Sequence, residues 1–124
     1  KAKNGEGLAL ALETLADGRA WKKLEAICVA QGGMRTPPKA LHVHPLAAPY
    51  AGRVIHINNR KLSRLAKLAG APEAKAAGIH LNVRLGDEVD RGQPLLYLHA
   101  ETGGALAYAL DYAAGAEDII EIDV

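Results

Sequence analysis

Four prolines lie close together in the first half of the chain, at Pro37, Pro38, Pro45 and Pro49. Proline has no main-chain N–H and fixes φ, so a segment this rich in proline cannot continue a helix. The apolar pattern also changes here, from a helical period before the prolines to strand-like alternation after them. We therefore expect two domains, residues 1–36 and residues 37–124, with a linker between Gly32 and Pro49.

The part before the prolines predicts a helical hairpin. Leucines recur at helical spacing over residues 8–15, and the pattern stops at Asp17-Gly18, a pair that favours a turn. A second helix is expected over residues 19–31, before the glycines Gly32-Gly33, which tolerate the positive φ of a helix end. The apolar residues that share one stripe of this helix are Trp21, Leu24, Ile27 and Cys28.

The part after the prolines predicts mixed strands and helices. Leu41 and Val43 alternate with histidines as in a strand, and a second strand is expected at Val54 to Ile57. A helix capped by Asn59 should follow and end at Gly70. Further strands are expected over residues 79–85, with one buried face, over residues 94–99, buried on both faces, and over residues 119–122, with a last helix over residues 104–114. The fold class is therefore α+β.

Composition excludes several classes of protein. With 49% hydrophobic and 23% charged residues, the chain is typical of a globular protein, and its net charge of +1 does not favour binding to nucleic acid or to an acidic membrane. The longest apolar run, Ala105 to Leu110, is too short for a membrane span. A single cysteine, Cys28, excludes an internal disulfide and suits a cytoplasmic setting. Because the chain opens at Lys1 without a methionine, we expect a piece of a longer polypeptide.

Candidate catalytic and metal-binding residues each have a simpler interpretation. His42 and His44 would project from one face of a strand, but they lack a third ligand, and alternation with Leu41 and Val43 favours placing them on the wetter face. Ser63, the only serine, falls within a helix and has no strained turn to expose it as a nucleophile. Cys28 falls on an apolar stripe, where a thiol is usually a small buried hydrophobe.

Glycine-rich and basic segments give equally weak signals. Gly5-Glu6-Gly7, Gly32-Gly33 and Gly103-Gly104 could offer N–H groups to a phosphate, yet none follows a strand in the pattern of a phosphate-binding loop. The four basic residues on the outer face of the predicted third helix are Arg60, Lys61, Arg64 and Lys67, and such a face is usually solvated. We therefore assign no catalytic, substrate-binding, cofactor-binding or metal-binding residue.

The most specific stretch is the turn pair from Gly86 to Leu95, preceded upstream by residues 48–54. Its glycines permit successive tight turns, and Val89 between them should point inward. This pattern resembles the barrel-sandwich fold of biotinyl and lipoyl carrier domains. A carrier needs a lysine at a hairpin tip after these turns, but the last lysine of the chain is Lys75. The pattern therefore predicts the fold without the carrier function.

Taken together, four segments resemble the C-terminal part of the thymidine, pyrimidine-nucleoside and AMP phosphorylases. They are LADGRA at 15–20, WKKLEAICVAQGG at 21–33, AGRVIHINNRKLSRLAKLAGAP at 51–72 and AGIHLNVRLGDEVDRGQPLLYLHA at 77–100. The resemblance implies that residues 1–36 are a helical hairpin from the end of the enzyme's α/β domain. It also implies that residues 37–124 are an α/β hammerhead or barrel-sandwich-hybrid-like domain.

The resemblance also implies a function and partners. The parent enzyme would convert thymidine and phosphate to thymine and 2-deoxyribose 1-phosphate, with phosphate as co-substrate and no cofactor, although uridine and AMP remain open as substrates. No segment of this chain matches the family's catalytic motifs, so the chain should be a non-catalytic structural domain, inactive by itself. Its partner would be the remainder of its own chain, in a homo-oligomer. The alternative is a stand-alone barrel-sandwich module that binds proteins.

Overall fold

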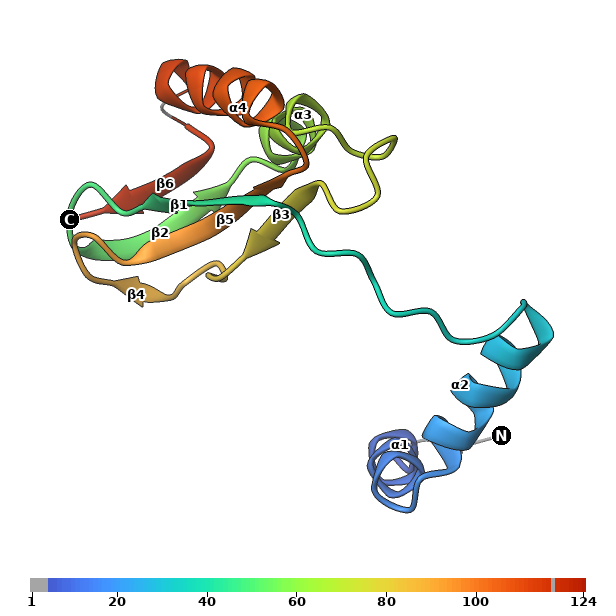
Figure 1. The fold of residues 1–124 in the computed structure, drawn as a ribbon. Helices are drawn as coiled ribbons and strands as arrows, with labels where there is room; N and C mark the ends of the chain where they lie inside the picture. The colour runs from blue at the N-terminus through green and yellow to red at the C-terminus, as the bar shows by residue number, and fades with distance from the viewer. Residues whose placement is uncertain (1–4, 117) are drawn as a thin grey trace. The chain divides into compact units, whose positions relative to one another are not determined.

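The computed structural model describes residues 5–116 and 118–124 of the chain. Residues 1–4, with which the predicted first domain opens, and residue 117 of the second lie outside this range. The described residues form two compact units, one ending at Thr36 and one starting at Pro37. Each unit is described by itself below (Figure 1).

The first unit is the predicted helical hairpin. Helix α1 spans Gly7–Ala16 and helix α2 spans Arg19–Ala30. Gly18, between the helices, has a φ of 81°, which is a left-handed conformation that favours glycine. Gly32 and Gly33, after α2, also have positive φ, so the predicted helix end is confirmed.

Neither hairpin helix buries a side chain. Leu8 and Leu15 of α1 are 73% and 68% exposed, and Trp21 of α2 is 53% exposed. Cys28, expected in a core, is only half-buried. The apolar stripes predicted from the sequence are therefore present, but the hairpin does not build a hydrophobic core of its own.

The second unit contains two three-stranded antiparallel sheets and two helices among the described residues, which confirms the α+β class. One sheet has the order β1-β5-β3 and the other the order β4-β2-β6. The strands are β1 His42–Ala47, β2 Gly52–Ile57, β3 Gly78–Leu81, β4 Glu88–Val89, β5 Pro94–Ala100 and β6 Ile120–Asp123. The helices are α3 Asn59–Leu68 and α4 Gly103–Gly115, which pack against each other over the strands (Figure 1).

Both helices of the second unit begin with a side-chain cap. The side-chain oxygen of Asn58 accepts a hydrogen bond from the Lys61 N–H at 3.2 Å, so Asn58 caps α3 and the predicted Asn59 is its first helical residue. Thr102 caps α4 in the same way, accepting from the Ala105 N–H at 3.2 Å. Such caps satisfy N–H groups that have no partner within the helix.

Two strand predictions need correction. The strand expected around Leu41 to His44 reaches further into the proline-rich segment than predicted, because β1 continues through Pro45 to Ala47. Proline is tolerated there because β1 is an edge strand, where a missing N–H does not interrupt pairing on the open side. The strand predicted over residues 79–85 ends at Leu81, and Val83 is buried in the cluster that includes residues of the other sheet.

The core consists of two clusters that share strand β5. Leu96 and Leu98 are buried beneath α3 and α4, whereas Leu95 points to the opposite side. The first cluster comprises Leu65, Ala69, Leu96, Leu98, Ala100, Ala109 and Ile119. The second comprises Ala48, Val54, Val83, Val89, Leu95 and Ile122. Residues 94–99 therefore form the predicted strand, and its leucines are buried on both faces.

We predict that Leu98→Ala destabilises the chain by about 2–5 kcal/mol, because it removes a fully buried side chain and leaves a cavity. The free energy of unfolding is measured by urea titration followed by far-ultraviolet circular dichroism. The matched control is Leu85→Ala, whose leucine is 67% exposed and should change stability by less than about 0.5 kcal/mol. Equal losses in the two variants would contradict the core assignment.

We also predict that Gly52→Ala destabilises the chain by about 1–3 kcal/mol, the range typical of overpacking. A Cβ at Gly52 would overlap the main-chain carbonyl oxygen of Asp123 in β6, so the two strands would have to separate. Gly104→Ala is the control, because its added methyl meets no atom within 4 Å and favours a helix. The same unfolding measurement should show unchanged or higher stability for the control.

Candidate functional site

The two histidines predicted as neighbours on a strand lie on the same side of the sheet as the helix-covered core. His42 is paired with Ala100 and His44 with Leu98, and directly paired residues of antiparallel strands point to the same face. The prediction that alternation places them on the wetter face is therefore wrong, although both remain exposed at the sheet edge. Alternation fixes which residues share a face, but the packing of α4 decides which face is covered.

The other histidines do not complete a metal site with this pair. His99 lies opposite Val43, on the other face of the sheet from His42 and His44. His80 lies opposite Tyr97, also on that other face. Within residues 5–116 and 118–124, no three His, Cys, Asp or Glu side chains are arranged to hold a metal ion.

The candidate nucleophiles lie within helices, and the glycine pairs lie at helix ends. Ser63 lies exposed in the middle of α3, and Cys28 lies in the hairpin helix α2. Gly32-Gly33 follows α2, and Gly103-Gly104 forms the first turn of α4, after its Thr102 cap. Gly5 precedes α1 with a φ of 87°.

The turn pair brings together the two segments that the sequence analysis singled out. The Gly86 N–H donates to the Val54 carbonyl and the Gly92 N–H donates to the Ala48 carbonyl, both at 2.8 Å. Gly86 and Gly92 have φ values of 91° and 85°, and Val89 between them is 4% exposed. The predicted inward anchor and its tight turns are therefore confirmed, and they join the two motifs into one structural unit.

Hollows on the surface of the second unit include an apolar one and one lined by polar residues. An open groove of about 480 Å³ lies between β1, β5, the end of α4 and the start of β6. Its walls are apolar, with Leu46, Leu110 and Ile120 among them, and His44 lies at its border. The second hollow, of about 450 Å³, lies on α3, and all the residues that line it are polar or charged, so it is called the polar hollow below. It is lined by Asn59, Arg60, Ser63, Arg64 and Lys67.

The four basic residues predicted to form a solvated face of α3 do not share one environment. Lys61 forms an ion pair with Asp118, just before β6. Arg64 stacks on the ring of Tyr112 in α4, with its guanidinium carbon 5.3 Å from the ring centre. Arg60, Arg64 and Lys67 line the polar hollow. These tertiary partners could not be found from the sequence, because residues 112 and 118 are far from α3 along the chain.

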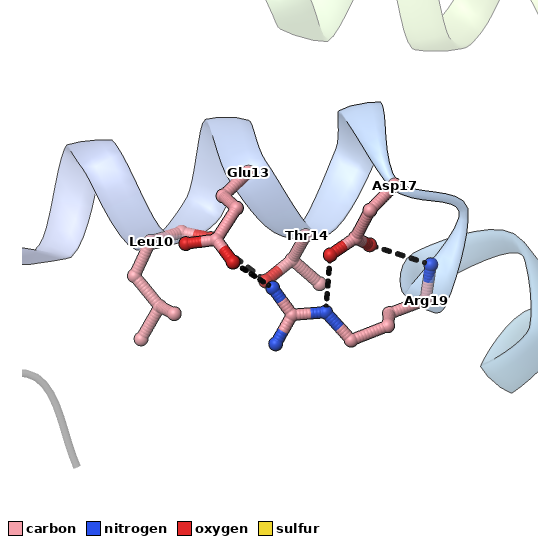
Figure 2. Close-up of polar contacts among 5 residues, drawn as sticks. All are labelled: Leu10, Glu13, Thr14, Asp17 and Arg19. Carbon is pink, nitrogen blue, oxygen red and sulfur yellow. Dashed lines mark hydrogen bonds and ion pairs between the residues drawn. The ribbon is translucent and has the colours of Figure 1, made fainter.

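The hairpin carries a polar cluster at its turn, shown in Figure 2. Arg19 at the start of α2 contacts Glu13 through Nη2 at 2.9 Å and Asp17 through Nε at 2.6 Å. The main-chain N–H of Arg19 donates to the other carboxylate oxygen of Asp17 at 3.0 Å. In α1, the Thr14 hydroxyl donates to the Leu10 carbonyl. This cluster fastens the end of α1 to the start of α2.

The same cluster lowers the pKa of Asp17 from its ordinary value of 3.8. The main cause is the hydrogen bond from the Arg19 main-chain N–H, which favours the ionised carboxylate. The Arg19 side chain lowers the pKa further. These contacts stabilise the turn between α1 and α2. They do not adjust the Asp17 carboxylate for proton transfer, because it stays ionised at neutral pH.

The fold and these surfaces define a structural domain of two small sheets and two helices, preceded by a helical hairpin. Among residues 5–116 and 118–124, no helix has both the length and the apolar character needed to cross a bilayer. Residues 53–119 match the pyrimidine nucleoside phosphorylase C-terminal domain. The chain belongs to this family.

Relatives match nearly the whole chain. A protein of Chelativorans sp. (strain BNC1) named "Putative thymidine phosphorylase" is 79% identical over 123 residues, which are 99% of this chain and 24% of that protein. Proteins of the same name from Tolumonas auensis and Parvibaculum lavamentivorans are each 62% identical over 122 residues, 98% of this chain and 24% of theirs. The chain thus spans about a quarter of the length of these relatives and corresponds to their C-terminal part.

We predict that the Asp17 carboxyl titrates below 3.8 and that Arg19→Gln raises its midpoint toward that value. Because the folded-state pKa lies below the unfolded one, the contact stabilises the folded chain above pH 3.8, and this contribution is lost as pH falls through the folded pKa. Carbon-13 NMR of the carboxyl group gives the midpoint. Arg91→Gln, at an exposed arginine of the second unit, should leave it unchanged. A midpoint at or above 3.8 in the unmodified chain would contradict the assignment.

Proposed function

We propose that this chain is the non-catalytic C-terminal domain of a nucleoside phosphorylase that acts on thymidine. The observation that carries the proposal is that the relatives named for this activity match the chain over almost its full length, while extending to about four times that length. The family match to a C-terminal domain supports the same assignment.

The proposed reaction is the reversible phosphorolysis of a pyrimidine nucleoside. An oxygen of inorganic phosphate bonds to the anomeric carbon of thymidine, the glycosidic C–N bond breaks, and its electron pair leaves with thymine, which is then protonated. The products are thymine and 2-deoxyribose 1-phosphate, and no cofactor is required. Such a reaction depends on positioning both substrates and on stabilising the charge of the phosphate and the departing base.

The groups that do this would belong to the part of the enzyme outside this chain. Among the described residues, the polar hollow is lined by side chains of α3 alone, and the charged groups of the hairpin turn around Arg19 are paired with one another. Neither place offers donors that face each other across a cleft. The lining of the apolar groove includes His44 but no lysine or arginine to hold phosphate. We therefore expect no phosphorolysis from the chain alone.

The hairpin supports a role as a part of the enzyme's larger body. Its two helices carry apolar stripes with no buried residue, and stripes of this kind normally pack on another surface. In this proposal, residues 1–36 complete the enzyme's α/β domain and residues 37–124 form a hammerhead-like domain that contributes rigidity, closure or subunit contact. The enzyme would work in the cytoplasm as a homo-oligomer.

The test compares this chain with the full-length product of its gene. Release of thymine from thymidine in the presence of phosphate is followed by ultraviolet absorbance. We expect phosphate-dependent release by the full-length protein and none by the 124-residue chain. Uridine and AMP are assayed alongside, and omission of phosphate is the control.

Each other outcome has a definite meaning. Activity in the short chain would contradict the proposal that the chemistry lies elsewhere. Turnover of uridine or AMP but not thymidine by the full-length protein would support the phosphorylase reaction and contradict thymidine as its substrate. Inactivity of both proteins on all three substrates would overturn the proposal and favour a protein-interaction module built on the barrel-sandwich unit.

A further inference from the structure

The polar hollow on α3 concentrates positive charge that no ion pair among the described residues neutralises. Arg60, Arg64 and Lys67 line it together, spaced three and four residues apart on one side of the helix. Within the described part of the chain, none of these three side chains is in an ion pair, whereas the neighbouring Lys61 is paired with Asp118. The chain as a whole carries only one net positive charge, so this accumulation is local.

The arrangement is unfavourable for α3 in the absence of an anion. Like charges at this spacing repel each other along a helix. Arg60 also lies in the first turn of α3, which contains no acidic residue, and a cation there opposes the positive end of the helix dipole. A bound anion would remove both penalties.

The groups in the hollow match the chemistry of a phosphate. Arginine forms paired, charge-assisted hydrogen bonds with phosphate oxygens, and lysine adds a point charge. Asn59 and Ser63 line the same hollow and can donate further hydrogen bonds. Arg64 is held in place by its stacking on Tyr112, which reduces the freedom that it would lose on binding.

We propose that Arg60, Arg64 and Lys67 form a binding site for a phosphate group, carried by free phosphate or by a small phosphomonoester. Asn59 and Ser63 complete the site as neutral donors. The hollow is open to solvent and lined by α3 alone, so a group attached to the phosphate would extend into solvent. This inference does not rest on the proposed phosphorolysis, because it concerns side chains of this chain alone.

The test is a titration of the nitrogen-15-labelled chain with inorganic phosphate and, separately, with methyl phosphate. Ionic strength is held constant with chloride, at pH 8, where both probes are mainly dianions. We expect saturable shifts of the amide signals of residues 59–67 in proton–nitrogen NMR spectra. Similar affinities for both probes would identify a site for the phosphate group alone, and tighter binding of one probe would identify the preferred source.

Charge-removing variants locate the site. Arg60→Gln and Arg64→Gln should each weaken binding about tenfold or more, since each removes charge-assisted hydrogen bonds. Arg91→Gln removes the same charge from an exposed position in the turn pair and should leave the affinity unchanged. The spectra themselves report whether each variant is folded, and Arg60→Gln retains the Arg64 stacking on Tyr112.

Two results would overturn the proposal. One is a set of small shifts that grow linearly with both probes and are spread over the surface. The other is an equal loss of affinity in Arg91→Gln and Arg60→Gln, which would mean that net charge matters and the hollow does not.

Discussion

The structure of the second unit depends on strand β5, which contributes to both hydrophobic clusters. Leu96 and Leu98 pack beneath α3 and α4, and Leu95 packs on the other side among residues of the second sheet. Apolar side chains on both faces of this one strand therefore contribute to both clusters. Because β5 is also the central strand of its sheet, it holds β1 and β3 in register. The remaining elements of this unit are arranged around it.

The turn pair connects this strand to the second sheet. The main-chain N–H groups of Gly86 and Gly92 donate hydrogen bonds to the carbonyls of Val54 and Ala48. These bonds hold the segment that leads into β5 beside β2. Val89 fills the space between the two turns with an apolar side chain. Gly52 permits the close approach of β2 to β6, where a side chain would collide with Asp123. The turn pair and Gly52 therefore serve the packing of this unit.

The two units differ in whether they bury side chains. The second has buried clusters on both sides of β5, whereas the hairpin has apolar stripes and a polar turn but no buried side chain. The polar cluster of Glu13, Asp17 and Arg19 orients the two helices with exposed ion pairs, which contribute little to stability in water. The family match lies entirely within the second unit, which is the unit with buried clusters.

The sequence by itself determined most elements and the family. Glycine and proline positions located the hairpin turns and the helix ends, and the spacing of apolar residues located α1, α2, α3 and β5, because these features depend on local backbone geometry. The segments at 51–72 and 77–100 were specific enough to indicate the phosphorylase family, which the comparison confirmed. Even the inward direction of Val89 followed from the turns on either side.

Only the tertiary structure decided which faces are covered and which charges are neutralised. Alternation placed His42 and His44 together, but the packing of α4 put them on the side of the core, contrary to the prediction. The strand predicted to reach residue 85 ends at Leu81, and Val83 beyond it packs in the second cluster with residues of the other sheet. Four basic residues of α3 look equivalent in sequence, yet Asp118 and Tyr112, distant along the chain, pair with two of them. Such contacts depend on elements that meet only after folding, so no local pattern encodes them.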